Sequence, residues 1–268
     1  MGTVAVTGAG SGIGAATAER LRADGHTVIG VDLRGADIDA DLGTPEGRDA
    51  AIAAITERSG GVLNGLVPCA GISGLPGRPA SLLVSVNYFG TVRLLEALRP
   101  LLVAGAPSAA VAISSNSVTC QPGYSMDLVE ALLADDEDAA REVADRGDSI
   151  MAYPASKLAV ARWVRTRATT ADWAGSGVNL NGVMPGMVMT PMVQEGYDDP
   201  VIREGMEQFA ASIPLGRPGR PTEIAGLLAF LLSEDARFFC GSLILCDGGT
   251  EATYRPLDWP ARWELPGM

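Results

Sequence analysis

The chain has 268 residues, a usual size for one α/β domain, and 47% of them are hydrophobic, which is enough for a large buried core and argues against disorder. Its 32 acidic and 20 basic residues give a net charge of −12, which repels phosphate backbones, so we expect no nucleic-acid partner. The apolar run Leu227–Leu232 is too short to span a bilayer, and no signal peptide is evident before the first predicted strand. We therefore expect a cytoplasmic protein with no membrane partner.

Short β-branched runs alternate with longer helical patterns along the chain. In chain order, the pattern predicts a strand at Thr3–Thr7, a helix at Ile13–Ala23, a strand at Thr27–Val31, a helix at Pro45–Arg58, a strand at Asn64–Cys69, a helix around Leu82–Leu98, a strand at Ala109–Ser114, a helix at Ile150–Ala171, a strand at Val178–Val183, a helix at Pro221–Leu232 and a strand at Ser242–Cys246. Repeated βα units with near-continuous apolar strands are typical of a parallel sheet with helices on both faces. We therefore predict an α/β protein with a single doubly wound, Rossmann-type sheet, whose ligands bind beyond the carboxyl ends of the strands.

The four cysteines and the single histidine limit the chemistry of the chain. Cys69, Cys120, Cys240 and Cys246 form no C-x-x-C pair, so we expect reduced thiols, of which only Cys69 lies near a predicted site, as a small buried side chain. Metal sites built on imidazole generally need more than one histidine, so we expect no metal. A Ser-His-Asp hydrolase would need His26 as its base, but this histidine lies in a predicted surface turn.

A glycine-rich turn follows the first predicted strand and leads into a predicted helix. Residues 7–14 read Thr-Gly-Ala-Gly-Ser-Gly-Ile-Gly. Glycines allow a tight turn and let the backbone approach a pyrophosphate, which the N-terminus of the helix then binds. A glycine-rich turn without a ligand is the alternative, but the strand–turn–helix context favours a dinucleotide site. The contacts predicted for this turn are Gly8, Ser11, Gly12, Ile13 and Gly14.

Asp32 follows the second predicted strand directly. A carboxylate at this place accepts hydrogen bonds from the hydroxyls of the adenosine ribose and repels a 2′-phosphate. The glycine turn holds no Lys or Arg, so the sequence favours NAD over NADP, although Arg34 is near enough to swing toward a phosphate. We also place Leu33 in this site, and Asp41 and Leu42 beside the adenine; a capped turn is the alternative for the last two.

Tyr153 and Lys157 lie four residues apart near the start of a predicted helix, so they share one face. A free tyrosine titrates near ~10, and a nearby cation lowers that pKa. A tyrosine tuned in this way protonates an alkoxide formed by hydride delivery, or deprotonates an alcohol in the reverse direction. The pair therefore predicts hydride transfer between a nicotinamide ring and a carbonyl or secondary alcohol.

These motifs resemble those of the short-chain dehydrogenase/reductase family over essentially the whole chain. The family's glycine turn matches Thr7–Gly14, and its catalytic tyrosine and lysine match Tyr153 and Lys157. The resemblance implies that Ser115 hydrogen-bonds the substrate oxygen. Ser114 is the alternative, because a slip of one residue would exchange the two serines.

The resemblance also implies a proton relay and further cofactor contacts. The family's active-site asparagine falls on Asn87, where it would hold a water that relays protons to the lysine; bending or capping a helix is the alternative role. The P-G-x-V-x-T segment implies contacts with the nicotinamide end from Pro185, Gly186, Val188 and Thr190. The Asp-Gly-Gly of residues 247–249 closes the last strand as in the family, with a structural role.

Two features depart from the family pattern. The usual N-N-A-G after the third strand reads Pro-Cys-Ala-Gly here, so the backbone of Cys69, Ala70 and Gly71 can approach the cofactor ribose but the usual asparagine contacts are lost. In addition, Ser115 and Tyr153 are farther apart in the sequence than is usual in the family.

The extra residues between them form an insertion at about 118–149, with short helices expected at Asp127–Ala134 and Glu137–Arg146. It resembles an insertion in the subgroup that includes bacterial 3α-hydroxysteroid dehydrogenase/carbonyl reductases, a pattern that coniferyl-alcohol dehydrogenases share. The insertion either caps the substrate cleft, changes which helices pair subunits, or forms a flexible acidic flap. Residues 1–268 are thus predicted to form one dinucleotide-binding and catalytic domain, with this insertion and an irregular tail at about 254–268.

Five of the nine methionines cluster in the segment that forms the family's mobile substrate loop: Met184, Met187, Met189, Met192 and Met206. Thioether side chains adapt to bulky apolar shapes, and Phe209 is expected to join them, although core packing explains some, Met184 in particular. We therefore predict an NAD-dependent dehydrogenase or carbonyl reductase for a hydroxysteroid or similar bulky apolar alcohol or ketone. The alternatives are an aromatic or terpenoid alcohol as substrate and a non-catalytic NAD-binding regulatory protein, against which the intact catalytic set argues.

By resemblance, the chain is expected to form a homodimer or homotetramer. The insertion leaves the geometry of that assembly open. Trp259 and Trp263 in the predicted tail are expected to pack on the domain or on a neighbouring subunit near a site.

Overall fold

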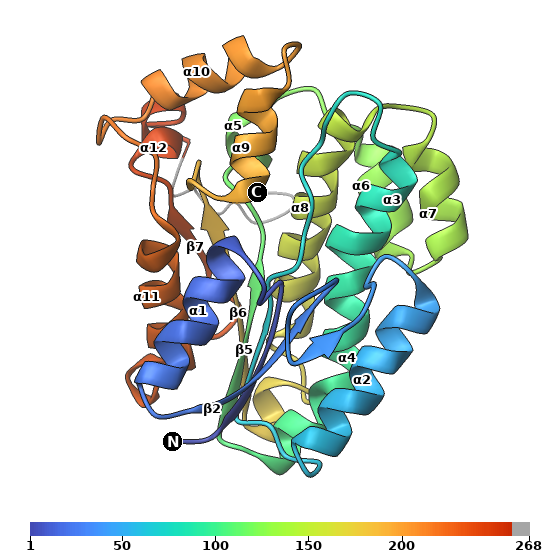
Figure 1. The fold of residues 1–268 in the computed structure, drawn as a ribbon, viewed down its shortest axis with the longest axis vertical. Helices are drawn as coiled ribbons and strands as arrows, with labels where there is room; N and C mark the ends of the chain where they lie inside the picture. Colours follow the sequence, from blue (N-terminus) through green and yellow to red (C-terminus); the bar gives the residue numbers. More distant parts are fainter. Residues whose placement is uncertain (259–268) are drawn as a thin grey trace, which may run out of the picture.

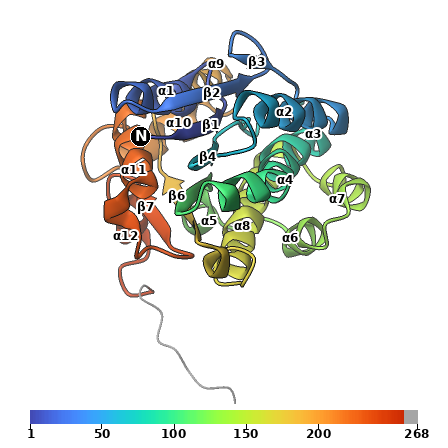
Figure 2. The same cartoon turned by 90° about the horizontal axis from the view of Figure 1, so that it is seen from below.

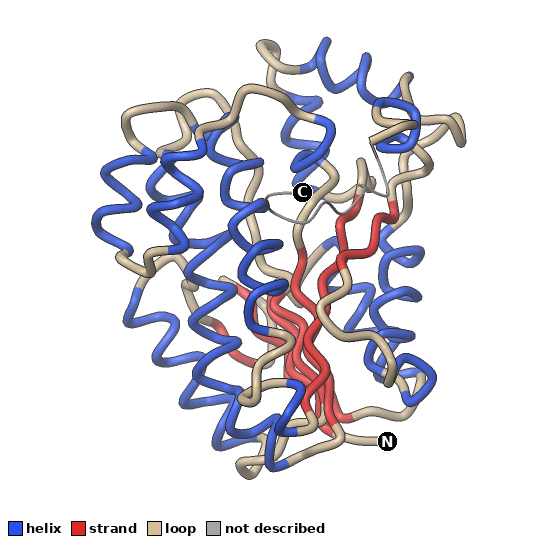
Figure 3. Tube along the Cα trace, turned by 180° about the vertical axis from the view of Figure 1, so that it is seen from behind, coloured by secondary structure: helices blue, strands red, loops and turns tan. Residues whose placement is uncertain are grey.

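The computed structural model describes residues 1–258, and its central element is one parallel sheet of seven strands (Figures 1 and 3). The strand order is β3-β2-β1-β4-β5-β6-β7, so the order reverses between β1 and β4. Ligands of such sheets bind at this switch point, beyond the carboxyl ends of the strands. The predicted fold class is confirmed. Trp259 and Trp263 of the predicted tail lie outside the described residues.

The elements have the following bounds. The strands are β1 (Thr3–Thr7), β2 (Thr27–Asp32), β3 (Ile38–Asp39), β4 (Gly65–Pro68), β5 (Ser108–Ile113), β6 (Val178–Pro185) and β7 (Leu243–Cys246). The helices are α1 (Gly12–Ala23), α2 (Pro45–Arg58), α3 (Ala80–Val84), α4 (Gly90–Ala104), α5 (Ser117–Cys120), α6 (Met126–Leu133), α7 (Glu137–Ala144), α8 (Ser149–Arg167), α9 (Pro191–Asp198), α10 (Arg203–Ala211), α11 (Pro221–Leu232) and α12 (Thr250–Tyr254), with a π-helical turn η1 (Ser85–Phe89) and 3₁₀ turns η2 (Ala174–Ser176) and η3 (Glu234–Ala236). Among residues 1–258, no helix is both long enough and apolar enough to cross a membrane.

Helices cover both faces of the sheet (Figure 2). α1 and α11 pack on one face, and α2, α4 and α8 pack on the other. Successive residues of β1 point to opposite faces: Val4 and Val6 join the core under α1 and α11, whereas Ala5 joins the core of the other face. All three are at most 1% exposed, which explains why the strand is apolar at consecutive positions rather than alternating.

The start of α2 follows directly from its sequence. Thr44 has an extended backbone, and its hydroxyl accepts a hydrogen bond from the Gly47 amide at 3.1 Å, which satisfies one of the free N–H groups of the first turn. Pro45 occupies the first helical position, where a missing N–H costs nothing. The bounds predicted for this helix are confirmed, as are those of α11.

The segment around Leu82–Leu98 differs from the continuous helix that was expected. It consists of α3, η1 and α4, and the π-helical turn contains Asn87, one of the predicted site residues. Such turns widen a helix locally and often occur at functional sites. The sequence also failed to predict β3, α5, α9, α10 and α12, because none exceeds nine residues and short elements carry little periodic signal. The tail predicted from residue 254 begins with the last residue of α12.

The insertion forms two docked helices, α6 and α7, beside α3 and α8 (Figures 1 and 2). Ser125 and Asp136 cap them, accepting hydrogen bonds from the amides of Leu128 at 3.2 Å and Ala139 at 3.1 Å. The side chains that they bury in the core shared with α8 are Leu128, Val129, Leu132, Ala140 and Ala144. A loose acidic flap therefore does not describe these helices.

We expect Leu132→Ala to destabilise the whole domain, because Leu132 is fully buried in that shared core. The expected loss is about 2–5 kcal/mol of unfolding free energy, since the substitution removes apolar contacts and leaves a cavity. Urea unfolding followed by circular dichroism measures it. Glu130→Ala, at an exposed position of the same helix, is the matched control and should change stability by less than about 0.5 kcal/mol. Equal stability of the Leu132→Ala variant and the parent would mean that the insertion unfolds independently.

Candidate active site

A cavity of about 330 Å³ lies at the switch point of the sheet. The glycine turn after β1 lines it, and Gly8 and Gly12 have φ values of 68° and 54°, a conformation that L side chains rarely adopt. A Cβ on Gly8 would lie 2.9 Å from the amide nitrogen of Ala70, and one on Gly14 would lie 2.1 Å from the carbonyl oxygen of Gly8. Glycine is therefore required for both the turn and the close approach of the segments after β1 and β4.

Every residue that the sequence predicted to contact the cofactor lines this one cavity. They are Gly8, Ser11, Gly12, Ile13, Gly14, Asp32, Leu33, Asp41, Leu42, Cys69, Ala70, Gly71, Tyr153, Lys157, Pro185, Gly186, Val188 and Thr190. Ser114, Ser115 and Met192, which the sequence singled out for other roles, line it too; sequence reasoning missed Ala40, Ile72, Val86, Ile113, Pro191 and Val193. These residues are apolar neighbours of the motifs. They shape the cavity wall, but their side chains form no motif that a sequence search could recognise. Individual contacts with a cofactor stay predictions.

Asp32 is held in place at one end of the cavity by two backbone amides. Its Oδ2 accepts from Gly10 at 2.8 Å and its Oδ1 accepts from Leu33 at 2.6 Å, and the side chain is half-buried. Among the described residues, Lys157 is the one basic side chain that lines the cavity, whereas Arg34 is exposed and lies outside the lining. This end of the cavity therefore suits a sugar diol and repels an additional phosphate. The residues at this end of the cavity therefore fit a dinucleotide whose adenosine ribose carries no 2′-phosphate.

Tyr153 and Lys157 share one face of α8, and Ser115 lies just beyond β5. Lys157 is 5% exposed; its Nζ donates to the carbonyl oxygen of Ile113 at 3.1 Å and lies 5.8 Å from the centre of the Tyr153 ring. The Ser114 hydroxyl donates to the Lys157 carbonyl at 2.8 Å, whereas Ser115 lines both this cavity and a neighbouring one. The geometry thus favours Ser115 over Ser114 for binding a substrate oxygen.

Burial controls the protonation of this pair. It raises the pKa of Tyr153 above the ordinary value of 10.0, and a hydrogen bond with Ser115 opposes the rise. Burial also lowers the pKa of Lys157 from 10.5 to about 8, with the Cys69 thiol opposing that fall. The expectation that the ammonium lowers the pKa of Tyr153 is therefore wrong for this structure, because burial of the phenol raises that pKa and the Ser115 hydrogen bond, not Lys157, opposes the rise. The phenol remains protonated at neutral pH.

Asn87 is fully buried in η1 and does not line the cavity. Its Oδ1 accepts from the Ile72 amide at 2.8 Å and its Nδ2 donates to the Ile72 carbonyl at 2.9 Å, so the side chain fixes the loop after β4. A Cβ on Gly71 would lie 3.1 Å from Asn87 Oδ1 and 3.6 Å from Lys157 Nζ, which places both groups against the same backbone. The asparagine thus lies on the lysine side of the site, and the water relay stays a prediction.

The other residues singled out by the sequence fall as follows. Cys69 is half-buried rather than fully buried, and desolvation raises the pKa of its thiol to about 12, so it is an uncharged part of the wall. Cys120 lines the neighbouring cavity, so the expectation that only Cys69 lies near a site is wrong. His26 is half-buried in the turn before β2 and lines neither cavity.

The neighbouring cavity, of about 590 Å³, meets the first at a shared wall that includes Ser115, Tyr153 and Gly186. Its walls come from the loop after β4, the start of the insertion and the segment from Met187 to Phe209. Apolar side chains make up much of its lining: Ile150, Met187, Met192, Val193, Val201, Ile202, Met206 and Phe209. The polar lining residues are Ser73, Ser115, Asn116, Ser117, Gln121 and Tyr153. A bulky apolar molecule that enters this space can present one oxygen to the shared wall.

Three of the five clustered methionines line this second cavity, namely Met187, Met192 and Met206, together with Phe209. Met184 is 5% exposed within β6 and belongs to the packed interior, as the alternative role predicted, and Met189 is 41% exposed and lines neither cavity. Residues 73–75, 116–117 and 120–122 complete this wall. The contribution of residues 73–75 was not predicted, because this loop comes near the methionines only in the folded chain, whereas a cap over the substrate cleft was one role left open for the insertion.

Comparison with known proteins identifies the family. A family model described as short chain dehydrogenase matches residues 2–126, and one described as Enoyl-(Acyl carrier protein) reductase matches residues 137–251. The chain belongs to the short-chain dehydrogenase/reductase family. It is therefore an oxidoreductase, as its motifs predicted.

Similar proteins resemble this dehydrogenase over nearly its whole length. A 3-alpha-hydroxysteroid dehydrogenase/carbonyl reductase of Comamonas testosteroni is 39% identical over 96% of this chain and 99% of its own. A coniferyl-alcohol dehydrogenase of Pseudomonas is 31% identical over 94% of this chain and 97% of its own. The crystal structure of a 3-alpha-hydroxysteroid dehydrogenase from Pseudomonas sp. B-0831, complexed with NADH, superposes with a TM-score of 0.90 at 47% identity, over 95% of this chain and 99% of that one.

We expect Tyr153 to titrate above pH 10 in the free protein, because burial disfavours its charged form. Ser115→Ala should raise this pKa further, since it removes the hydrogen bond that stabilises the phenolate. The difference in tyrosinate absorbance between the parent and Tyr153→Phe, followed against pH, isolates this one of the five tyrosines. A midpoint below pH 9 would contradict the dominance of burial.

Proposed function

We propose that this protein is an NAD(H)-dependent dehydrogenase and carbonyl reductase that acts on a hydroxysteroid or a similarly bulky apolar secondary alcohol or ketone. One observation carries the proposal: Tyr153 and Ser115 lie on the wall shared by a cavity that fits a dinucleotide and a larger methionine-lined cavity. An oxygen atom held at this wall is within reach of both hydroxyl groups and of whatever the first cavity holds.

Several observations support NAD(H) as the cofactor. Asp32 presents a carboxylate to the ribose end, the cavity lining adds no arginine there, and a similar structure contains NADH. When bound, the nicotinamide ring supplies or accepts the hydride. The glycine turn and the first residues of α1 line the cavity, and the free amides and positive end of this helix suit a pyrophosphate.

The chain's own residues handle the oxygen and its proton. In ketone reduction, the Ser115 hydroxyl donates a hydrogen bond to the substrate oxygen, and the Tyr153 hydroxyl gives that oxygen its proton. In alcohol oxidation the phenolate takes the proton back, so the raised pKa of Tyr153 makes oxidation faster as pH rises toward that pKa. Lys157 is buried with its Nζ 5.8 Å from the centre of the Tyr153 ring, where its positive charge would favour the phenolate during oxidation.

The substrate class rests on the shape and chemistry of the second cavity. A volume of about 590 Å³ and flexible methionine walls suit a large apolar skeleton better than a sugar or a carboxylate. A relative named for 3-alpha-hydroxysteroids and carbonyl reduction agrees with this class. An aromatic alcohol is the second candidate, because another relative is named for coniferyl alcohol. The intact catalytic set argues against a purely regulatory NAD-binding protein.

We also propose that the protein works as a homodimer or homotetramer in the cytoplasm. The family resemblance supports an oligomer. Phe238, which is fully exposed, and Phe230, at 39% exposure, are apolar side chains that another subunit would cover. Light scattering coupled to size exclusion measures the mass in solution.

The first test is oxidation of a panel of hydroxysteroids, monoterpenols and benzylic alcohols with NAD, followed by NADH absorbance. We expect turnover with a hydroxysteroid. Tyr153→Phe should keep NADH affinity within about 2-fold and lower kcat by roughly 100-fold or more, because it removes the proton-transferring hydroxyl. Activity of this variant comparable with that of the parent would refute the mechanism. Turnover restricted to benzylic or terpenoid alcohols would replace the substrate class and leave the mechanism standing.

A second test concerns cofactor choice. Asp32→Ala should weaken NADH binding by about 10-fold and reduce discrimination against NADPH, because it removes acceptors for the ribose hydroxyls and a charge that repels phosphate. Fluorescence titration with both nucleotides measures the two dissociation constants. Asp39→Ala, at an exposed carboxylate outside the cavity lining, is the matched control and should change neither value. An unchanged NADH to NADPH ratio in the Asp32 variant would show that this carboxylate does not face the ribose.

A further inference from the structure

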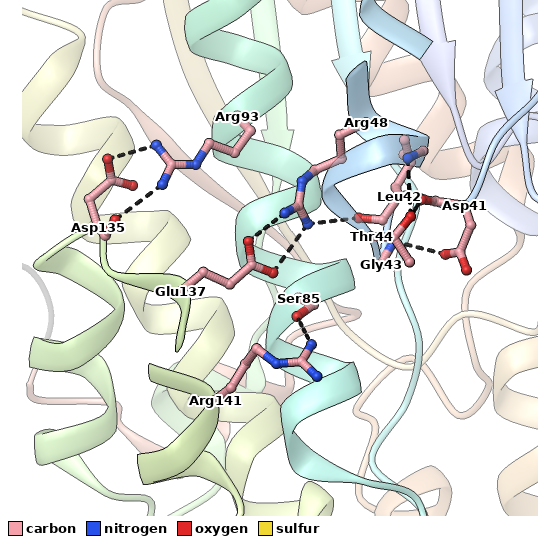
Figure 4. A network of polar contacts seen from close by, with 11 residues as sticks. Asp41, Leu42, Gly43, Thr44, Arg48, Ser85, Arg93, Asp135, Glu137 and Arg141 are labelled. Atoms are coloured by element: carbon pink, nitrogen blue, oxygen red, sulfur yellow. Dashed lines mark hydrogen bonds and ion pairs between the residues drawn. The ribbon is translucent and has the colours of Figure 1, made fainter. Parts of the chain in front are cut away.

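Arg48 is a buried charge that joins three segments of the chain (Figure 4). It lies on α2, is 4% exposed, and donates through Nη1 and Nη2 to the carboxylate of Glu137, the first residue of α7 in the insertion. Its Nη1 also donates to the carbonyl oxygen of Leu42 at 3.2 Å. The Glu137 side chain is only 16% exposed, so each charge depends on the other for compensation.

The carbonyl that the guanidinium holds belongs to the wall of the first cavity, which Asp41 and Leu42 line. This wall is a turn built on the N-terminus of α2: the amide and hydroxyl of Thr44 donate to the Asp41 carbonyl at 3.2 and 3.1 Å, and Asp41 Oδ1 accepts from Gly43 at 2.9 Å. On its other side the turn packs on the start of α4, because a Cβ on Gly90 would lie 3.3 Å from the Leu42 carbonyl oxygen. The position of the turn therefore depends on groups outside the cavity.

Glu137 determines whether Arg48 stays in this position. Among the described residues, its carboxylate is the one that pairs with this guanidinium. A buried arginine that loses its carboxylate keeps its charge and must move toward water, because it cannot deprotonate. Such a movement removes the donor from the Leu42 carbonyl and releases the cavity wall at that point.

Other side-chain ties also hold the insertion to the rest of the domain, and none of them involves a residue that lines the first cavity. The Ser81 amide donates to Asp145 Oδ1 at 2.8 Å, and the Ser149 hydroxyl bonds the amide and carbonyl of Leu75.

Two more ties are drawn in Figure 4. Arg93 of α4 donates to Asp135, at 2.8 Å to Oδ2 and 3.1 Å to the carbonyl oxygen. Arg141 of α7 donates to the Ser85 hydroxyl at 2.7 Å. These ties hold the insertion in place without contacting Leu42. They therefore serve as an internal comparison for the Arg48–Glu137 ion pair.

We propose that Glu137 is a positioning residue for cofactor binding, which acts through Arg48 on the Leu42 carbonyl at the adenine end of the first cavity. The proposal rests on the proposed NAD(H)-dependent function. It gives the insertion a role at the cofactor site, on the opposite side of the first cavity from the substrate. α6 and α7 line neither cavity, so these two helices are not a lid over the substrate; only residues 120–122 of the insertion reach the second cavity.

The test compares affinity with catalysis in Glu137→Gln. The dissociation constants of NADH, from its fluorescence, and of ADP-ribose, from competition with NADH, should both rise by about 2- to 30-fold, the range expected for a residue that acts through a neighbour. ADP-ribose lacks the nicotinamide, so an equal loss for both ligands locates the effect at the adenosine half. The kcat at saturating NAD should stay within about 2-fold of the parent, because the residue lies away from Tyr153 and Ser115.

Two further variants separate positioning from stability. Asp135→Asn weakens the neighbouring tie and leaves the backbone relaxed, since asparagine tolerates the φ of 65° at this position; both dissociation constants should stay within 2-fold of the parent. The double variant Arg48→Met/Glu137→Leu replaces the ion pair with apolar packing, which keeps such sites folded. It provides no donor to Leu42, so NADH affinity should remain reduced although the melting temperature recovers.

Three results would overturn the proposal: unchanged NADH and ADP-ribose affinities in Glu137→Gln, an equal loss of affinity in Asp135→Asn, or full recovery of affinity in the apolar double variant. If Glu137→Gln fails to fold, the double variant carries the test. A parent protein that binds no NADH would contradict the proposed function itself, whereas normal binding in the parent and in all variants contradicts only the role of Glu137.

Discussion

The backbones that leave β1 and β4 approach so closely that nothing larger than glycine fits at Gly8. The Ala70 amide donates to the Thr7 hydroxyl at 3.0 Å, which fastens the two segments together at the point where the strand order reverses. Because these strands then diverge, a cavity forms above them, and the amino end of α1 points into it. The placement of every other site residue depends on this junction, since β5, β6 and α8 are positioned by the same sheet.

Desolvation is the main electrostatic effect inside that cavity. The chain as a whole carries −12, yet the reacting groups are a buried phenol and a buried amine whose pKa values both move toward the neutral form. A protonated phenol is the form that ketone reduction consumes, whereas alcohol oxidation needs the phenolate. At neutral pH the free protein therefore holds Tyr153 as the phenol, and the phenolate that oxidation needs forms as the pH rises toward the raised pKa.

The sequence predicted what is encoded locally. The strand–glycine–helix pattern, the Thr44 and Pro45 signals and the tyrosine–lysine spacing each lie within a few residues, and each leads to the correct element or cavity. It did not predict the raised pKa of Tyr153, because the degree of burial depends on residues from distant segments. Nor could it predict the π-helical turn at Asn87, which interrupts an otherwise continuous helical pattern.

The contact between Arg48 and Glu137 spans 89 residues and has no local signature, so the sequence left the role of the insertion open. An apolar contact would have docked α7 at a lower cost in free energy, because the desolvation of two buried charges offsets much of their attraction. A guanidinium differs from an apolar side chain in having donors to spare: two nitrogens engage the carboxylate, and one of them also holds the Leu42 carbonyl. The ion pair thus adds direction to the contact. That directional hydrogen bond is what extends the influence of the insertion from the surface of α2 to the wall of the cavity.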